Sequence, residues 1–147
     1  MNRTSSIFAR LALSLLSSSL LGLALAHELR VVGAEGGTQY EIVVGMLNEP
    51  VFTEVRTGLD LTIRSVAEGR PVEGLETSLE VTITAPGGQT RTLQVRPRYG
   101  APGAYTDDYI LTEPGTYDIR VRGFIGDLEV DETFPREVAD GHDLRFP

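Results

Sequence analysis

The stretch EPGTYDIRVRG, residues 113–123, decides the fold class of this chain. Ile119 and Val121 alternate with charged residues, and this period of two is typical of a half-buried β-strand. A Pro-Gly turn stands before the strand. Tyr117 follows that turn, where an immunoglobulin-like sandwich places its tyrosine corner. The alternative for Tyr117 is a side chain that only packs in the core.

The same alternation recurs along most of the chain. It predicts strands within residues 40–46, 59–64, 79–84, 92–96, 104–112, 116–122 and 128–134. Turn formers separate these strands, and APGGQT (residues 85–90) is expected to close a hairpin. Helical spacing is absent outside the N-terminal segment. We therefore expect an all-β fold, an antiparallel immunoglobulin-like β-sandwich of about seven strands.

The last two predicted strands can be aligned with each other. If Arg122 and Asp127 flank a turn at residues 123–126, Arg120 faces Glu129 and Val121 faces Leu128. In the same alignment Ile119 faces Val130, and Asp118 faces Asp131. One face of the pair is then apolar and the other charged.

Two acidic groups require interpretation. Asp127, Glu129 and Asp131 share one strand face and suggest a calcium site, but arginines lie opposite two of them, which favours a solvated ladder of ion pairs. Asp107 and Asp108 point to opposite faces of a strand. This arrangement allows one of the two to be partly buried, but a charged pair at a strand end near a loop is the favoured interpretation.

The N-terminus has the pattern of a secretory signal peptide. Arg3 and Arg10 precede an apolar, serine-rich run, and Ala24-x-Ala26 matches the small residues at a cleavage site. We expect cleavage after Ala26. The predicted organisation is a signal peptide (1–26), a sandwich domain (27–136) and a C-terminal tail (137–147), located in the periplasm or outside the cell.

The composition excludes several partner classes. Cleavage removes two of the 13 basic residues and none of the 21 acidic ones, so the mature net charge is −10. Nucleic acid and anionic membranes are therefore poor partner candidates. The chain has no cysteine, so its fold is held without disulfides.

Catalytic motifs are not found. The chain has no Gly-rich phosphate loop, no G-x-S-x-G elbow, no cysteine nucleophile and no H-E-x-x-H pair. A Ser-His-Asp set is not excluded by residue counts, but nothing in the sequence places such residues together. We therefore expect a protein that is not an enzyme.

The distinctive chemistry lies at the two histidines. Cleavage after Ala26 gives His27 a free amine beside its imidazole, and these two nitrogens can chelate one metal ion. Such nitrogen donors, completed by another histidine and a carboxylate, suit Cu(II). Asp140 and His142, two residues apart in a predicted extended segment, offer a carboxylate and an imidazole on one side. Met46 is a further candidate ligand, for Cu(I), although a methionine on an apolar strand face is more often a core residue.

Two resemblances add expectations. An N-terminal histidine on an immunoglobulin-like sandwich, followed later by Asp-Gly-His, resembles periplasmic copper-binding proteins of the CopC type. That resemblance implies His27, Asp140 and His142 as copper ligands in a histidine brace. The chain departs from the CopC pattern in the residues after His27 and in ending soon after His142.

The second resemblance covers most of the mature chain. VVGMLNEPVF (residues 43–52), PVEGLE (71–76) and VDETF (130–134) are similar to an uncharacterised family of secreted bacterial immunoglobulin-like β-sandwich proteins. This implies secretion and the sandwich fold.

Two functions remain open. The first is a non-catalytic module that binds a protein partner in the cell envelope, through a sheet edge or through LNEPVF (residues 47–52). The second is a periplasmic copper-binding protein that uses His27.

Overall fold

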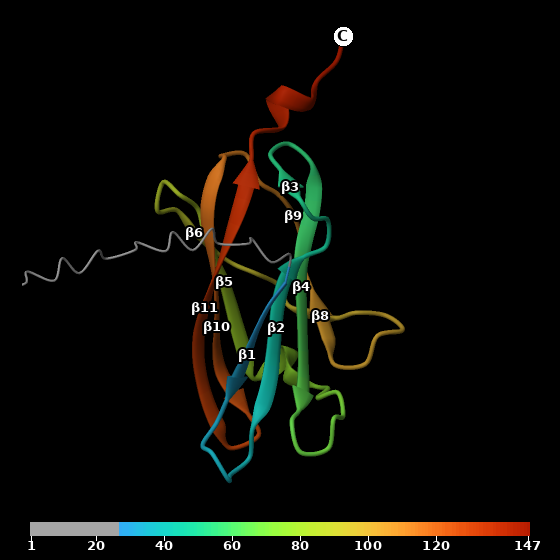
Figure 1. Cartoon of the computed structure of the whole chain (residues 1–147), viewed down its shortest axis with the longest axis vertical. Coiled ribbons are helices and arrows are strands. Elements are labelled where there is room, and N and C mark those ends of the chain that lie inside the picture. The colour runs from blue at the N-terminus through green and yellow to red at the C-terminus, as the bar shows by residue number, and fades with distance from the viewer. Residues whose placement is uncertain (1–26) are drawn as a thin grey trace, which may run out of the picture.

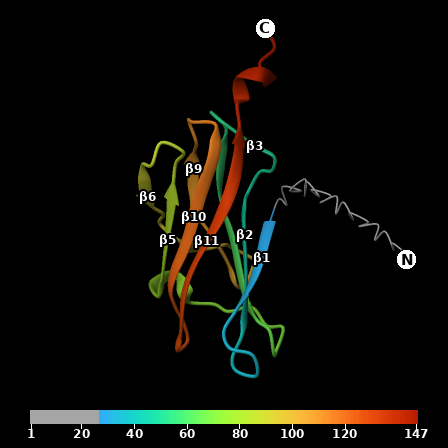
Figure 2. The ribbon, with the colours of Figure 1, turned by 60° about the vertical axis from the view of Figure 1, so that its left-hand side comes forward.

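The computed structural model describes residues 27–147, so the expected signal peptide lies outside the described residues. Two β-sheets lie face to face in it (Figures 1 and 2), and this is the expected immunoglobulin-like sandwich. The first sheet has the order β1-β2-β4-β8-β7, with β9 also paired to β4. The second has the order β3-β11-β10-β5-β6. All pairings are antiparallel except that of β3 with β11.

The described chain contains eleven strands, more than the expected seven, and several of them are only two or three residues long. The first sheet is made of β1 (His27–Val32), β2 (Tyr40–Met46), β4 (Arg56–Ser65), β7 (Arg96–Pro97), β8 (Ala104–Thr106) and β9 (Asp108–Ile110). The second is made of β3 (Val51–Phe52), β5 (Leu79–Thr84), β6 (Thr90–Thr92), β10 (Gly115–Ile125) and β11 (Leu128–Ala139). Two short 3₁₀ turns, η1 (Leu75–Thr77) and η2 (Gly141–Leu144), complete the described elements.

The tyrosine corner expected at Tyr117 is confirmed. The Tyr117 hydroxyl donates a hydrogen bond to the Glu113 carbonyl oxygen at 3.0 Å and accepts one from the Glu113 N–H at 3.3 Å. The ring is buried, so the side chain both packs and ties down the turn before β10.

The predicted alignment of β10 with β11 is wrong, because the turn between them lies further along the chain than expected. Ile125 pairs with Leu128, so the hairpin turns at Gly126 and Asp127 and not at residues 123–126. Gly123 lies inside β10 with a positive φ of 133°, and a Cβ there would collide with the Ser78 carbonyl oxygen. This glycine marks a close approach of two backbones and not a turn. The apolar and charged faces are as expected, because the shift preserves the alternation.

The prediction of one strand over residues 92–96 is also wrong. β6 ends at Thr92, and the chain then crosses from the second sheet to β7 in the first. Asp107 stabilises this crossing, because its carboxylate accepts a hydrogen bond from the Gln94 N–H at 3.0 Å.

For the two neighbouring aspartates, the less favoured alternative of a partly buried carboxylate is confirmed for Asp107. Asp107 is buried and also accepts a hydrogen bond from Arg96 at 3.3 Å. Asp108 is more exposed and pairs with Arg96 at 2.5 Å and with Arg56 at 3.2 Å. The Arg96 hydrogen bond lowers the pKa of the Asp108 carboxyl.

The core lies between the sheets and follows the alternation of the sequence. Its buried members include the inward-facing apolar residues of β2, β4, β5 and β10, together with Phe134 of β11. β11 continues to Ala139, beyond the expected domain end at residue 136. The last residues of the expected tail form η2 and the segment after it, which extend from one end of the sandwich (Figure 1).

Candidate functional site

The edge strand β1 exposes an unusual set of side chains. Its residues alternate, so that Glu28, Arg30 and Val32 point toward the second sheet while Leu29 and Val31 point outward. Leu29 is 54% exposed and Val31 is 51% exposed. The first sheet therefore carries two large apolar side chains on the outer face of its edge.

Ion pairs hold β1 against the opposite sheet. Arg30 contacts Glu28 at 2.7 Å and Glu132 of β11 at 2.8 Å, and its guanidinium lies 4.6 Å from the ring centre of Phe134. The hydrogen bond to Glu132, and then that to Glu28, raises the pKa of Arg30. Paired charges and a cation–π contact close the gap between the sheets and hold the edge strand in place.

A second arginine, on β11 of the opposite sheet, also contacts β1 and its neighbour β2 from the core side. Arg136 of β11 is buried, donates a hydrogen bond to the Val44 carbonyl oxygen and lies 3.6 Å from Glu28. Burial lowers the pKa of its guanidinium. The outer face of β1 is thus presented by a fixed backbone.

His27 begins β1 and lies flat across its neighbour Gly45. A Cβ on Gly45 would come within 2.7 Å of His27 Nε2, so the ring occupies the space that a side chain would fill. This position brings Nε2 to 3.3 Å from the Asp60 carboxylate on β4. Arg98 approaches the other Asp60 oxygen at 3.4 Å. A row of polar groups thus runs across the outer face from β1 to the β7–β8 connection.

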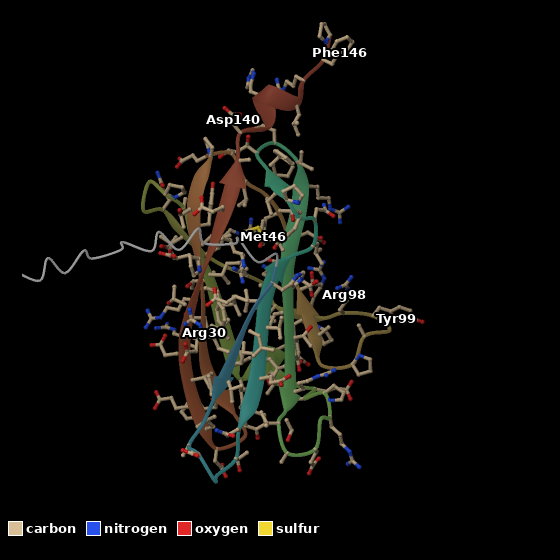
Figure 3. All side chains as sticks on the ribbon, in the orientation of Figure 1. Arg30, Met46, Arg98, Tyr99, Asp140 and Phe146 are labelled. Carbon is tan, nitrogen blue, oxygen red and sulfur yellow. The ribbon has the colours of Figure 1, made fainter. Side chains whose placement is uncertain are left out.

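That connection is a hairpin with Tyr99 at its tip. Tyr99 is fully exposed and points away from the sandwich (Figure 3). The backbone below it is ordered by hydrogen bonds from the Arg98 N–H to the Ala104 carbonyl at 2.9 Å and from the Ala101 N–H to the Arg98 carbonyl at 3.2 Å. A hollow of about 330 Å³ lies beside the hairpin and is lined in part by Glu73, Glu76 and Arg98. The outer-face site comprises His27, Leu29, Val31, Asp60, Arg98 and Tyr99.

The structure does not bring together the residues expected to bind copper. Asp140 caps η2 by accepting a hydrogen bond from the His142 N–H at 2.8 Å, at the end of the molecule that carries the C-terminus (Figure 3). Met46 is buried in the core. Among the side chains that the structure describes, no group of three or more His, Cys, Asp or Glu is arranged to hold a metal ion. His27 instead has Asp60 as its carboxylate neighbour.

The acidic face of β11 forms ion pairs. Arg120 donates two hydrogen bonds to Asp131, at 2.6 and 2.5 Å, and Arg122 pairs with Glu80 at 2.6 Å. The Arg120 hydrogen bond lowers the pKa of the Asp131 carboxyl. The ion pairing expected in place of a calcium site is confirmed for Asp131 only, because Arg120 pairs with Asp131 and not with Glu129, and Arg122 pairs with Glu80 of β5 and not with Asp127.

The LNEPVF segment, the other expected binding element, is used by the fold itself. Glu49 accepts a hydrogen bond from the Met46 N–H at 2.9 Å, and Asn48 donates one to the Arg56 carbonyl at 2.8 Å. Val51 is buried in β3, next to β11. Most of this segment therefore stabilises the end of the sandwich.

Comparisons with known proteins add the following. No family model matches the chain, and no curated protein matches it. Among solved structures, it is similar to the filamin domain of Lin-41, with 13% sequence identity and a TM-score of 0.47 over 65% of this chain and 90% of that domain. No helix within residues 27–147 is long and apolar enough to span a membrane.

Sequence reasoning found His27 but missed Asp60, Arg98 and Tyr99. An aromatic residue in a Gly- and Pro-rich turn, as in PRYGAPG (residues 97–103), is a usable signal, because such a side chain has little structure around it to bury it. The approach of Asp60 to His27 has no comparable signal, since it depends on how three strands align.

Proposed function

We propose that this protein is a secreted or periplasmic, non-catalytic β-sandwich module that binds a protein partner in the cell envelope through the outer-face site. The observation that carries the proposal is Tyr99, fully exposed at the tip of a hydrogen-bonded hairpin. Tyr and Arg are the residues most enriched at the energetic centres of protein interfaces.

The arrangement of the outer-face site supports this role. Tyr99 offers a large side chain with only two rotatable bonds, so little conformational entropy is lost when a partner covers it. The backbone hydrogen bonds under the tip lower the entropy loss further. Leu29 and Val31 add apolar surface on the same face of the sheet.

The location in the envelope is supported by the sequence. The N-terminal signal pattern and the absence of cysteine fit a protein exported without a need for disulfides. The strong negative charge favours a partner surface that carries positive charge near the contact.

Site-specific photo-crosslinking in the producing cells tests the proposal. Replacement of Tyr99 by p-benzoylphenylalanine is expected to capture one discrete protein. The matched control is Phe124, which is 51% exposed on the opposite sheet and is expected to capture none. A Tyr99→Ala variant should fail to compete for the captured protein. Equal capture at both positions, or at neither, would contradict the proposal.

Copper binding is a second candidate function, and the contact of His27 with Asp60 favours it. An Nε2–H that donates to Asp60 leaves the Nδ1 lone pair free, and Nδ1 is the nitrogen that can chelate with the amine of the same residue. Asp60 then orients the ring, while Asp140 and His142 lie elsewhere.

Titration with Cu(II) distinguishes this candidate. Protein that begins at His27 should bind one Cu(II) with nitrogen hyperfine splitting in its electron paramagnetic resonance spectrum, and Asp60→Asn should weaken binding by about tenfold. The His142→Ala variant should bind as the parent does. Weak binding that is the same with an extra residue before His27 would refute the candidate.

A further inference from the structure

The outer edge of β1 is open to pairing. β1 is the first strand of its sheet and pairs along its whole length with β2 alone. No strand of the described chain lies on its other side. An edge strand of six residues presents backbone N–H and C=O groups that another strand can satisfy.

We infer that β1 pairs antiparallel with β1 of a second copy of this chain, on a two-fold axis that passes through Leu29. The sequence of the strand, HELRVV, carries one acidic residue and one basic residue placed symmetrically about Leu29. In this register Glu28 of one copy lies opposite Arg30 of the second copy, and the same pair forms again across the axis. Opposite charges directly across an antiparallel pair stabilise it.

The neighbouring registers are unfavourable. A shift of the axis to Glu28 places the two Glu28 carboxylates opposite each other, and a shift to Arg30 places the two guanidinium groups together. Like charges directly opposite destabilise a pair. Charged residues that point inward from an edge strand usually prevent pairing. In β1 the two charges have opposite sign, so they favour the register centred on Leu29 over the two neighbouring registers.

The outer side chains fit the same arrangement. Leu29 of each copy meets its equivalent, and His27 lies opposite Val31 of the second copy. Two half-exposed apolar side chains in each copy thus gain apolar contacts across the strand pair, while the outer face of the sheet stays open. The other sheet ends in β6, a three-residue strand with Thr, Arg and Thr exposed, which offers no apolar contact of this kind.

A two-fold axis perpendicular to the sheet turns the same face of both copies to one side. The dimer therefore displays two Tyr99 hairpins in the same direction, which allows bivalent contact with a partner. The pairing of β1 does not depend on what that partner is. Its failure and the failure of the proposed function are therefore separate results.

The interface uses one short strand from each copy, so we expect a reversible dimer that dissociates on dilution. Sedimentation equilibrium of the purified chain should show monomer and dimer in a concentration-dependent balance. Leu29→Lys places two ammonium groups on the axis and should leave only monomer, with an unchanged circular dichroism spectrum. Thr92→Lys, on the edge strand β6, should dimerise as the parent does.

Cross-linking tests the register. The chain has no cysteine, so Leu29→Cys introduces a single thiol at the axis. Directly opposite Cβ atoms in an antiparallel pair are close enough for a disulfide to form. Mild oxidation should convert this variant to a covalent dimer, and should leave the Thr92→Cys control monomeric. A parent chain that stays monomeric at every concentration, or equal cross-linking of both variants, would overturn the inference.

Discussion

Removal of one hydroxyl from the tyrosine corner tests the fold most directly. Tyr117→Phe keeps the buried ring and deletes the hydrogen bonds to the Glu113 carbonyl and N–H, at 3.0 and 3.3 Å. A hydrogen bond contributes a net stabilisation of about 0.5–1.5 kcal/mol, and the longer bond lies at the weak end of that range. Water can reach Glu113 in part, which limits the penalty. We expect a loss of about 1–2 kcal/mol in the free energy of unfolding.

Urea denaturation followed by circular dichroism measures this loss. For a domain of this size, the loss corresponds to a fall of about 4–8 °C in Tm, with an unchanged urea m-value. Tyr99→Phe is the matched control, because the fully exposed Tyr99 hydroxyl has no hydrogen-bond partner among the described residues. The control should stay within about 0.5 kcal/mol of the parent. Equal losses in the two variants would refute the assignment of the corner.

Other substitutions have equally defined outcomes. The buried Tyr109 hydroxyl has no hydrogen-bond partner in residues 27–147, so Tyr109→Phe should leave the free energy of unfolding at neutral pH unchanged or higher. Tyr105→Phe deletes hydrogen bonds of 2.6 and 3.2 Å and should lower the free energy of unfolding, measured by urea denaturation, by about 1–2 kcal/mol. Burial raises the pKa of Tyr109 above its ordinary value of 10.0. The parent protein should therefore lose stability as the pH rises above 10, because the unfolded chain ionises first. Tyr109→Phe should reduce this loss when both proteins are unfolded with urea over that pH range. Arg120 lowers the pKa of Asp131, so this ion pair stabilises the fold above the ordinary carboxyl pKa of 3.8 and stabilises it less as the pH falls below that value. Asp131→Asn should therefore reduce the pH dependence of the free energy of unfolding below pH 3.8. An unchanged pH dependence would contradict the pairing. Gly123→Ala should lower the free energy of unfolding by more than about 2 kcal/mol, because a side chain at this positive φ collides with a backbone carbonyl, and a loss under about 0.5 kcal/mol would show that the backbone adapts.

The fold was predictable because alternation is a local property. The apolar positions of β2, β4, β5 and β10 each point to one side of an extended chain, whatever that side later packs against. The same signal cannot locate a turn. Gly123 was interpreted as part of a turn because glycine serves both turns and close backbone contacts, and only the approach of Ser78 distinguishes the two.

The candidate site was only partly predictable. His27 stood out through its chemistry, yet its contact with Asp60 requires a glycine at the register position between them. Asp140 and His142 were expected on one side of an extended segment, but His142 lies in the 3₁₀ turn η2 and Asp140 contacts its backbone N–H.

The sequence by itself determined the class of fold, the apolar faces of the strands and the tyrosine corner, because each depends on residues close together in the chain. The signal pattern and the copper-binding residues it also suggested remain predictions. The tertiary structure alone decided that β1 is an edge strand, that Arg30 and Arg136 close the gap beneath it, and that His27, Asp60 and Arg98 form one row. These contacts join residues distant in sequence. Their distances follow from strand order and register, which no local pattern encodes.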